Sequence, residues 1–185
     1  MKLFLVPLTF LGAFFLFSAR QLPLREFKIN GEAQGTTYAV SYYATDSVVS
    51  KKQIDSILNV IDLSMSLYKP NSNISQFNKA NNGLKLDDHF LKVVQRSFEI
   101  YKDTKGIFDI TVEPLVQYWT KAKHEPGQAD SASIQQLLPL VGMNKLVLKG
   151  KYLAKQRTGT HLDVNGIAQG YSVDVVANFL EKQGM

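Results

Sequence analysis

Asp163 belongs to the most informative polar segment of the chain, residues 161–174, which read HLDVNGIAQGYSVD. The pattern predicts a strand that passes through a turn containing Gly166 into a helix. Such a junction presents free backbone N–H groups and the positive end of a helix, which together hold phosphate groups. The segment therefore favours binding of a phosphorylated ligand beside a carboxylate, although a plain connection between a strand and a helix has the same pattern.

Asp109 lies in a second segment where a polar side chain interrupts an apolar pattern, residues 106–115, which read GIFDITVEPL. A carboxylate inside an apolar run needs hydrogen-bond donors or a ligand to offset its loss of water. Two interpretations are open, because Asp109 can bind a ligand or can cap the turn that follows it. Glu113, which precedes Pro114, is expected to be solvated.

Tyr68 opens a third segment, residues 68–78, which read YKPNSNISQFN. Here a helix that ends in an aromatic residue meets a turn rich in Pro, Asn and Ser. The simplest interpretation makes Tyr68 the last core residue of its helix. The other aromatic and imidazole side chains have no partners at catalytic or ligand spacing, and we expect Trp119 in the core, His161 on a strand surface, and His89 and His124 in solvent.

A domain of mixed α/β or α+β class must position these segments, because short strand-like and helix-like stretches alternate along the chain. Ser50 and Gln53 form a capping box that begins a helix running until Pro70. An Asp87 or Asp88 cap begins a second helix, which ends at Gly106. The other expected elements are a strand at 36–44, a polar loop at 120–130, a short helix at 134–138, a hairpin across Gly150 and Lys151, a strand at 162–164 and a last helix at 168–182 stopped by Gly184.

The composition excludes several classes of site. A chain of 185 residues, 45% of them hydrophobic, can bury one sizeable core. It contains no Cys, which excludes disulfides, thiolate zinc sites and a cysteine nucleophile. The net charge of +5 favours weak attraction to an anionic lipid, a nucleotide or an acidic partner, while the lack of long basic runs argues against nucleic acid.

Residues 1–19 have the features of an export signal: a basic Lys2, an uncharged apolar run, and small residues at its end. The run is short for a membrane span, so we expect a cleaved signal peptide or an uncleaved N-terminal anchor. Either one places the rest of the chain outside the cytoplasm, in the periplasm or on the outer face of the inner membrane. Residues 20–30 are interpreted as a linker, and residues 31–185 as the domain.

Taken in order, the segments resemble the FAD:protein FMN transferase family, the ApbE-type flavin transferases. AQGTTYAV is similar to the family's entry strand, LYKPNSNISQFN to its Tyr-Pro-Ser turn, GIFDITVEPLVQYW to its acidic segment and LDVNGIAQGYSVD to its last strand–turn–helix segment. The resemblance implies an α+β fold, with a mixed sheet and packed helices in a T-fold-like domain. It further implies that these residues are the amino-terminal part of a longer domain, a view that the apolar stripe on the last predicted helix also favours.

The resemblance assigns roles to individual residues. Positions of the family that contact FAD correspond to Gln34, Tyr68, Ile107, Phe108, Asp109, Asp163 and Gln169, and a metal-binding position corresponds to Gly166, which would act through its backbone carbonyl. No catalytic residue is assigned. Two positions depart from the family pattern, because Asn165 replaces a common Gly and Gln169 replaces a common Lys, so we expect a changed affinity for the dinucleotide.

The implied activity is transfer of FMN from FAD to a Thr or Ser hydroxyl of an exported flavoprotein, with Mg²⁺ as cofactor and AMP as the released product. Subunits of membrane redox pumps are among the implied acceptors. We expect the 185 residues alone to be inactive, because one backbone carbonyl cannot supply the roughly six oxygen ligands of Mg²⁺. The alternatives are a non-catalytic exported flavin-binding module and, less well matched, a receptor domain unrelated to flavin.

Overall fold

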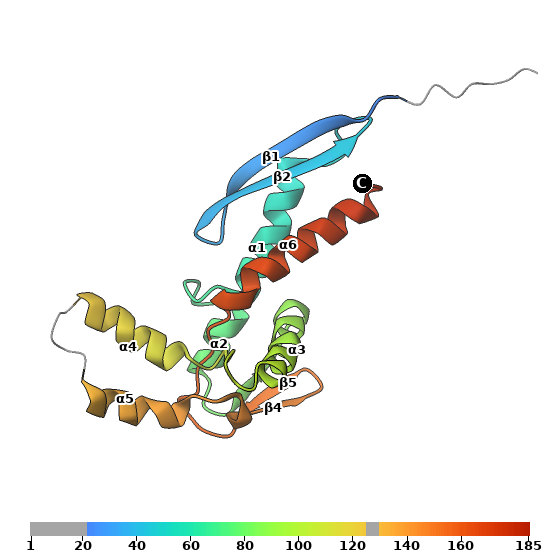
Figure 1. Cartoon of the computed structure of the whole chain (residues 1–185). Helices are drawn as coiled ribbons and strands as arrows, with labels where there is room; N and C mark the ends of the chain where they lie inside the picture. Colours follow the sequence, from blue (N-terminus) through green and yellow to red (C-terminus); the bar gives the residue numbers. More distant parts are fainter. Residues whose placement is uncertain (1–21, 125–129) are drawn as a thin grey trace, which may run out of the picture.

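The computed structural model describes residues 22–124 and 130–185, which form an elongated molecule of the α+β class (Figure 1). A two-stranded hairpin lies at one end and a larger body of helices with a small sheet at the other. Two long helices, α1 and α6, pass between the two parts. The predicted leader at 1–19 lies outside the described residues.

The hairpin consists of β1 (Arg25–Ala33) and β2 (Thr36–Ala44), paired antiparallel with Ala33 opposite Thr36. Its turn residues, Gln34 and Gly35, have φ angles of 56° and 74°, as the tight turns that suit twisted hairpins require. The prediction of a linker at 20–30 is therefore wrong from Arg25 onward. Half-buried and exposed side chains alternate along β1, which is the pattern of a strand with one covered face.

Helix α1 (Lys51–Met65) begins with the predicted capping box, in which Ser50 and Gln53 satisfy each other's backbone N–H groups. It ends five residues before Pro70, so Tyr68 lies beyond it. The backbone of Ser66 is extended, and the Ser66 carbonyl accepts a 2.6 Å hydrogen bond from the Ser72 hydroxyl. This bond stabilises the turn that leads into α2 (Asn73–Lys79).

Helices α3 (Asp88–Asp103) and α6 (Asn165–Lys182) confirm two predicted helices. Asp87 caps α3, and the chain leaves that helix through Gly106 at a φ of 86°. Helix α6 begins three residues before the predicted start. Gly184, with a φ of 87°, follows it as expected.

Helix α4 (Glu113–His124) extends through the first part of the predicted polar loop, which is therefore wrong for residues 120–124. Its last turn carries Lys121, Lys123 and His124, whose charges suit a helix C-terminus. Trp119 is 53% exposed, so its expected core position is also wrong. Helix α5 (Ser131–Leu137) follows, then two short 3₁₀ helices, η1 (Leu138–Leu140) and η2 (Met143–Lys145).

The second sheet has the order β3–β5–β4 and is antiparallel throughout. Strands β4 (Leu146–Lys149) and β5 (Tyr152–Lys155) are the predicted hairpin, and β3 (Gly83–Lys85) pairs with β5. The predicted strand at 162–164 is wrong, because that segment is irregular and Leu162 bonds to the side chain of Asn78 rather than to a neighbouring strand. In the described residues the strands thus form two small antiparallel sheets rather than one mixed sheet.

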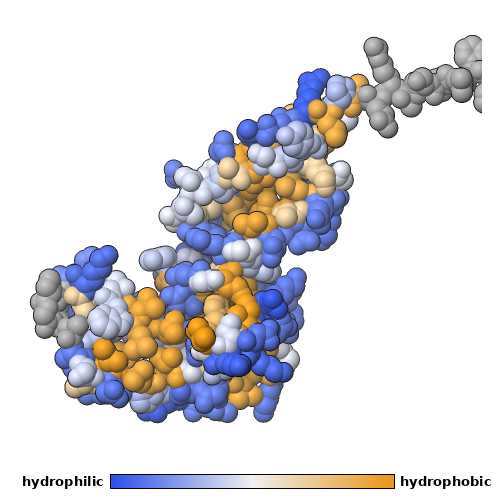
Figure 2. Space-filling view, viewed as in Figure 1, coloured by the Kyte–Doolittle hydropathy of each residue, from blue (hydrophilic) through white to orange (hydrophobic). Residues whose placement is uncertain are grey.

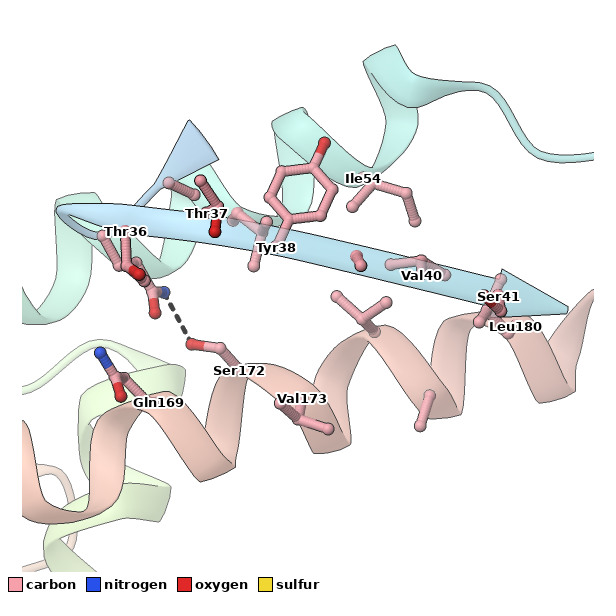
Figure 3. Close-up of a pocket in the computed structure, with 16 residues that line it drawn as sticks. Thr36, Thr37, Tyr38, Val40, Ser41, Ile54, Gln169, Ser172, Val173 and Leu180 are labelled. Atoms are coloured by element: carbon pink, nitrogen blue, oxygen red, sulfur yellow. Dashed lines mark hydrogen bonds between the residues drawn. The ribbon is translucent and has the colours of Figure 1, made fainter. Parts of the chain in front are cut away.

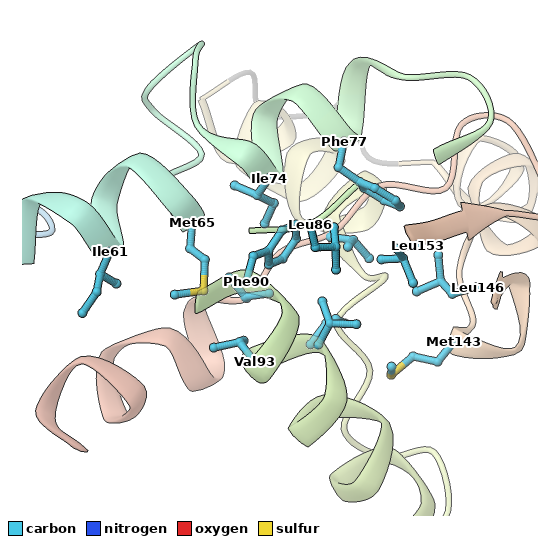
Figure 4. Close-up of a cluster of buried hydrophobic side chains, with 14 residues drawn as sticks. Ile61, Met65, Ile74, Phe77, Leu86, Phe90, Val93, Met143, Leu146 and Leu153 are labelled. Atoms are coloured by element: carbon cyan, nitrogen blue, oxygen red, sulfur yellow. The ribbon is translucent and has the colours of Figure 1, made fainter. Parts of the chain in front are cut away.

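The larger hydrophobic core joins the end of α1 to α2, α3 and the second sheet (Figure 4). Phe77 and Phe90 lie at its centre with no exposed surface and with ring centroids 6.5 Å apart. A smaller core, which includes Tyr42, Ile54 and Val176, packs the hairpin against α1 and α6. The two cores fix the hairpin turn, the end of α1 and the start of α6 relative to one another.

Within the described part of the chain, the helices are too short or too polar for any to cross a membrane.

Candidate functional site

A cavity of about 310 Å³ opens where the hairpin turn, the end of α1 and the start of α6 meet. We call it the central cavity. Three of the residues to which the family resemblance assigns flavin contacts, Gln34, Tyr68 and Gln169, line it together although they lie far apart in the chain. The other lining residues are Gly35, Ile61, Asp62, Met65, Ser66, Leu67, Lys69, Asn165 and Ala168.

Gln34 ties the hairpin turn to α6. Its side-chain amide donates a 2.7 Å hydrogen bond to the hydroxyl of Ser172, drawn as a dashed line in Figure 3. The Ser172 hydroxyl in turn donates to the carbonyl of Ala168, at 2.9 Å. The amide oxygen of Gln34 and the exposed side chain of Gln169 provide polar groups at the same mouth of the cavity.

Tyr68 is presented to solvent rather than packed in the core, because 91% of its surface is exposed. The loop that carries it is nevertheless well held. The Tyr68 N–H donates to the Ser66 hydroxyl, and the Ser72 N–H donates to the Lys69 carbonyl at 3.0 Å. An exposed aromatic ring on a fixed loop is suited to stack on a planar ligand, so the interpretation of Tyr68 as a core residue is wrong.

A second cavity of about 420 Å³ runs between β2 and α6 and shares Gln34 and Gln169 with the central cavity. We call it the hairpin groove. Figure 3 shows Val40 and Ser41 on β2, and Val173 and Leu180 on the neighbouring helix α6. Most of its lining is apolar, and apolar surface gathers over the same part of the molecule in Figure 2.

Asp109 holds its own turn together. One carboxylate oxygen accepts from the Thr111 N–H at 2.7 Å and from the Thr111 hydroxyl at 2.6 Å, and the other accepts from the Met143 N–H at 3.2 Å. The interpretation of Asp109 as a turn cap is therefore confirmed, while its contact with FAD stays a prediction. Of its neighbours, Ile107 is 90% exposed and Phe108 is half-buried beside Gly166.

Asp163 lies two residues before α6. Its carboxylate accepts from the Asn165 N–H at 2.8 Å, and its own N–H donates to the Ile110 carbonyl at 2.8 Å. The segments that carry Asp109 and Asp163 are thus side by side. Gly166, in the first turn of α6, is exposed. None of Ile107, Asp109, Asp163 or Gly166 lines the central cavity, although Asn165 next to Gly166 does.

Asn78 fixes the segment in front of Asp163. Its side-chain oxygen accepts from the Leu162 N–H at 2.8 Å, and its side-chain nitrogen donates to the Leu162 carbonyl at 3.0 Å. The amide therefore replaces the ladder bonds of the strand that the sequence predicts there. Its own backbone carbonyl accepts from the ammonium of Lys155 at 3.2 Å.

Glu113 is buried, with a carboxylate oxygen 3.1 Å from Nδ1 of His161, so the expectation that Glu113 is solvated is wrong. His161 lies on an irregular segment rather than on a strand. Burial lowers the pKa of the Lys155 ammonium from 10.5 to about 8, although the Glu113 carboxylate opposes that shift. We call these side chains, of which Thr111, Glu113 and Lys155 are buried and Asn78, Asp109 and His161 half-buried, the buried polar network.

His89, expected in solvent, instead has its Nδ1 2.8 Å from the hydroxyl of Tyr171. Burial raises the pKa of the Tyr171 hydroxyl, and the carboxylates of Asp87 and Asp88 add to the effect. The contact joins α3 to α6 and lies outside both cavities. We therefore interpret it as a packing contact.

In the two described ranges, 22–124 and 130–185, no three His, Asp or Glu side chains gather closely enough to hold a metal ion.

The model of the ApbE family matches residues 34–185. The chain belongs to the ApbE family. Curated relatives named FAD:protein FMN transferase include the protein of Vibrio cholerae, 28% identical over 184 residues, and that of Haemophilus influenzae, 29% identical over 179 residues. These alignments cover 95% and 89% of this chain, but only 55% and 52% of the two relatives.

Solved structures of ApbE flavin transferases have the same fold. The Vibrio cholerae structure superposes with a TM-score of 0.79 at 28% identity, covering 88% of this chain and 55% of its own. The apo structure of the Pseudomonas stutzeri flavinyl transferase gives a TM-score of 0.78 at 27% identity, with the same coverage. The chain therefore spans about half the length of the ApbE proteins it matches.

Proposed function

We propose that the protein transfers FMN from FAD to a Ser or Thr hydroxyl of an exported flavoprotein and releases AMP. The observation that carries the proposal is that Gln34, Tyr68 and Gln169 line one cavity. The curated relatives named FAD:protein FMN transferase support the reaction. Because this chain spans about half of them, the activity is proposed for the whole protein.

In the reaction, the acceptor oxygen bonds to the phosphorus of the FMN half, the bond from that phosphorus to the bridging oxygen breaks so that this oxygen leaves with AMP, and the hydroxyl proton passes to solvent. Such transfers depend mainly on positioning and on stabilisation of charge. In this chain, Tyr68 would stack on a ring of FAD, and the amides of Gln34 and Gln169 would hydrogen-bond it. The positive N-terminus of α6 would favour its phosphates.

Mg²⁺ is part of the proposal because the resemblance implies it. Mg²⁺ prefers about six oxygen ligands in an octahedron, with one or two carboxylates, phosphates and water among them. Gly166 offers one carbonyl, and the described residues supply no cluster of acidic side chains around it. They do not form a magnesium site by themselves, so we derive no step through the metal.

We also propose that the protein acts outside the cytoplasm, in the periplasm or on the outer face of the inner membrane. The export-signal pattern of residues 1–19 supports this location. It also limits the acceptor to an exported flavoprotein, such as a subunit of a membrane redox pump.

Covalent flavin transfer tests the proposed function. The whole protein is incubated with an exported flavoprotein acceptor, FAD and Mg²⁺, denatured, and separated on a gel that is inspected for flavin fluorescence. We expect a fluorescent acceptor band that disappears when FAD is omitted or when the acceptor hydroxyl residue is changed to Ala.

A non-catalytic flavin-binding module is the second candidate, because a cavity lined by Gln34, Tyr68 and Gln169 can bind FAD without transferring part of it. The same samples distinguish the two. Tight FAD binding without a covalent band contradicts the enzyme and supports the module, and failure to bind FAD contradicts both.

A further inference from the structure

Lys69 carries the only positive charge among the residues that line the central cavity in the described structure. The one other charged lining residue is Asp62. The remaining polar groups of the wall are amides and hydroxyls. FAD carries two negatively charged phosphates, so the cavity needs a source of positive potential if it is to favour FAD over an uncharged flavin.

In the free protein the Lys69 ammonium lies against the last turns of α1. Its Nζ is 3.3 Å from a carboxylate oxygen of Asp62 and donates to the side-chain oxygen of Asn59 at 3.1 Å. The Lys69 side chain is 37% exposed and that of Asp62 is 20% exposed. Ion pairs that are partly open to water contribute little to stability, so Lys69 can exchange this partner at low cost.

A second part of the cavity wall reinforces the charge of Lys69. It is formed by the first turns of α6, through Asn165, Ala168 and Gln169. The N-terminal end of a helix carries a partial positive charge that attracts anions. Phosphates of a ligand whose ring stacks on Tyr68 would therefore lie between two sources of positive potential.

We propose that Lys69 is the phosphate-binding residue of the central cavity. On FAD binding its ammonium leaves Asp62 and pairs with the pyrophosphate, while Asp62 acts as the competing partner that holds Lys69 in the free protein. This inference rests on the proposed function. It extends that function by naming the residue that distinguishes phosphorylated from unphosphorylated flavin.

Titration of two flavins into the Lys69→Gln variant tests this assignment. FAD should bind about tenfold more weakly than to the wild type, because a charge-assisted contact is lost. Riboflavin, which has the same ring system and no phosphate, should bind within about twofold of the wild type. Flavin fluorescence reports both affinities, and a thermal melt of each variant checks that it is folded.

The Asp62→Asn variant should change affinity in the opposite direction. It frees Lys69 from its competitor, so FAD should bind about threefold more tightly, and the gain should vanish in the double variant with Lys69→Gln. Lys149→Gln is the matched control, since it removes the same charge from an exposed lysine at the end of β4 that lines neither cavity.

The outcomes separate this inference from the proposed function. A folded wild-type protein that binds neither flavin overturns the proposed function. FAD binding that is unaffected by Lys69→Gln, or a loss that is equal for FAD and riboflavin, overturns only the role of Lys69.

Discussion

Tyr68 and Lys69 on the wall of the central cavity lie in contact with water, whereas the acidic side chains of the buried polar network are bound by protein partners. Tyr68 is 91% exposed, and the Lys69–Asp62 pair is open to water. By contrast, Asp109 accepts from three donors and Glu113 is buried against His161. The polar groups on the cavity wall are therefore available to a ligand, whereas those of the network stabilise the fold. Tyr68 and Lys69 on the cavity wall can exchange water and protein partners for a ligand. The network instead holds the backbone segment that carries Asp163 and leads into α6.

The largest effect on stability is expected from Asp109, which connects the network to η2. Asp109→Ala should lower the free energy of unfolding by about 3 kcal/mol, because the N–H groups of Thr111 and Met143 and the Thr111 hydroxyl lose their acceptor. Urea unfolding followed by circular dichroism measures the loss. Asp103→Ala, at an exposed position at the end of α3, should change it by less than about 0.5 kcal/mol. Similar stabilities for the two variants would contradict the engaged role of Asp109.

Lys155 makes the stability of the network depend on pH. The folded protein releases the Lys155 proton near pH 8, and the unfolded chain holds it until about 10.5. Between these values the unfolded state binds more protons, so stability rises with pH. Relative to Lys155→Met, the wild type should gain up to about 1.4 kcal/mol per pH unit from pH 8 to 10.

Urea unfolding of both proteins at several pH values measures this gain for Lys155. If the free energies of unfolding of the two proteins changed in parallel with pH, the lysine would titrate normally and its burial would have no electrostatic cost.

The smallest effect is expected from Tyr68, and it should appear in binding rather than in stability. Tyr68→Ala removes a stacking surface, so FAD affinity should fall several-fold, by about 0.5 to 1.5 kcal/mol. The free energy of unfolding should change by less than about 0.5 kcal/mol, because the ring is exposed. Tyr43→Ala is the matched control, an exposed tyrosine that lines neither cavity. If Tyr68→Ala lowered the free energy of unfolding and left the affinity for FAD unchanged, the role of Tyr68 would be structural.

Elements defined by local hydrogen bonds could be predicted from the sequence. The caps at Ser50 and Asp87 and the turn across Gly150 depend on residues a few positions apart, and all three are found as expected. The end of α1 could not be predicted in this way. It depends on the Ser66 carbonyl, which accepts from Ser72 six residues later.

Within the buried polar network only the Asp109 turn cap, whose partner Thr111 is two residues away, could be predicted, because the other partners are distant in the sequence. Glu113 meets a histidine 48 residues away, and Asn78 meets a backbone segment 84 residues away. One signal was available, since Lys155 lies two residues after Leu153 on a strand and therefore faces the same core. The family resemblance named Gln34, Tyr68 and Gln169 but gave no role to Asp62 or Lys69, although Lys69 lies within the quoted turn segment. That all five line one cavity emerges only from the structure.

The hairpin also bears on how the protein behaves at high concentration. In the described chain β1 and β2 pair only with each other, so each strand has one unpaired edge. Strand β1 carries four charged side chains along its length, whereas the nine residues of β2, TTYAVSYYA, carry none. An uncharged edge rich in Tyr, Val and Thr can template pairing with another chain. Self-association of this polypeptide, including growth of fibrils, would therefore begin along β2.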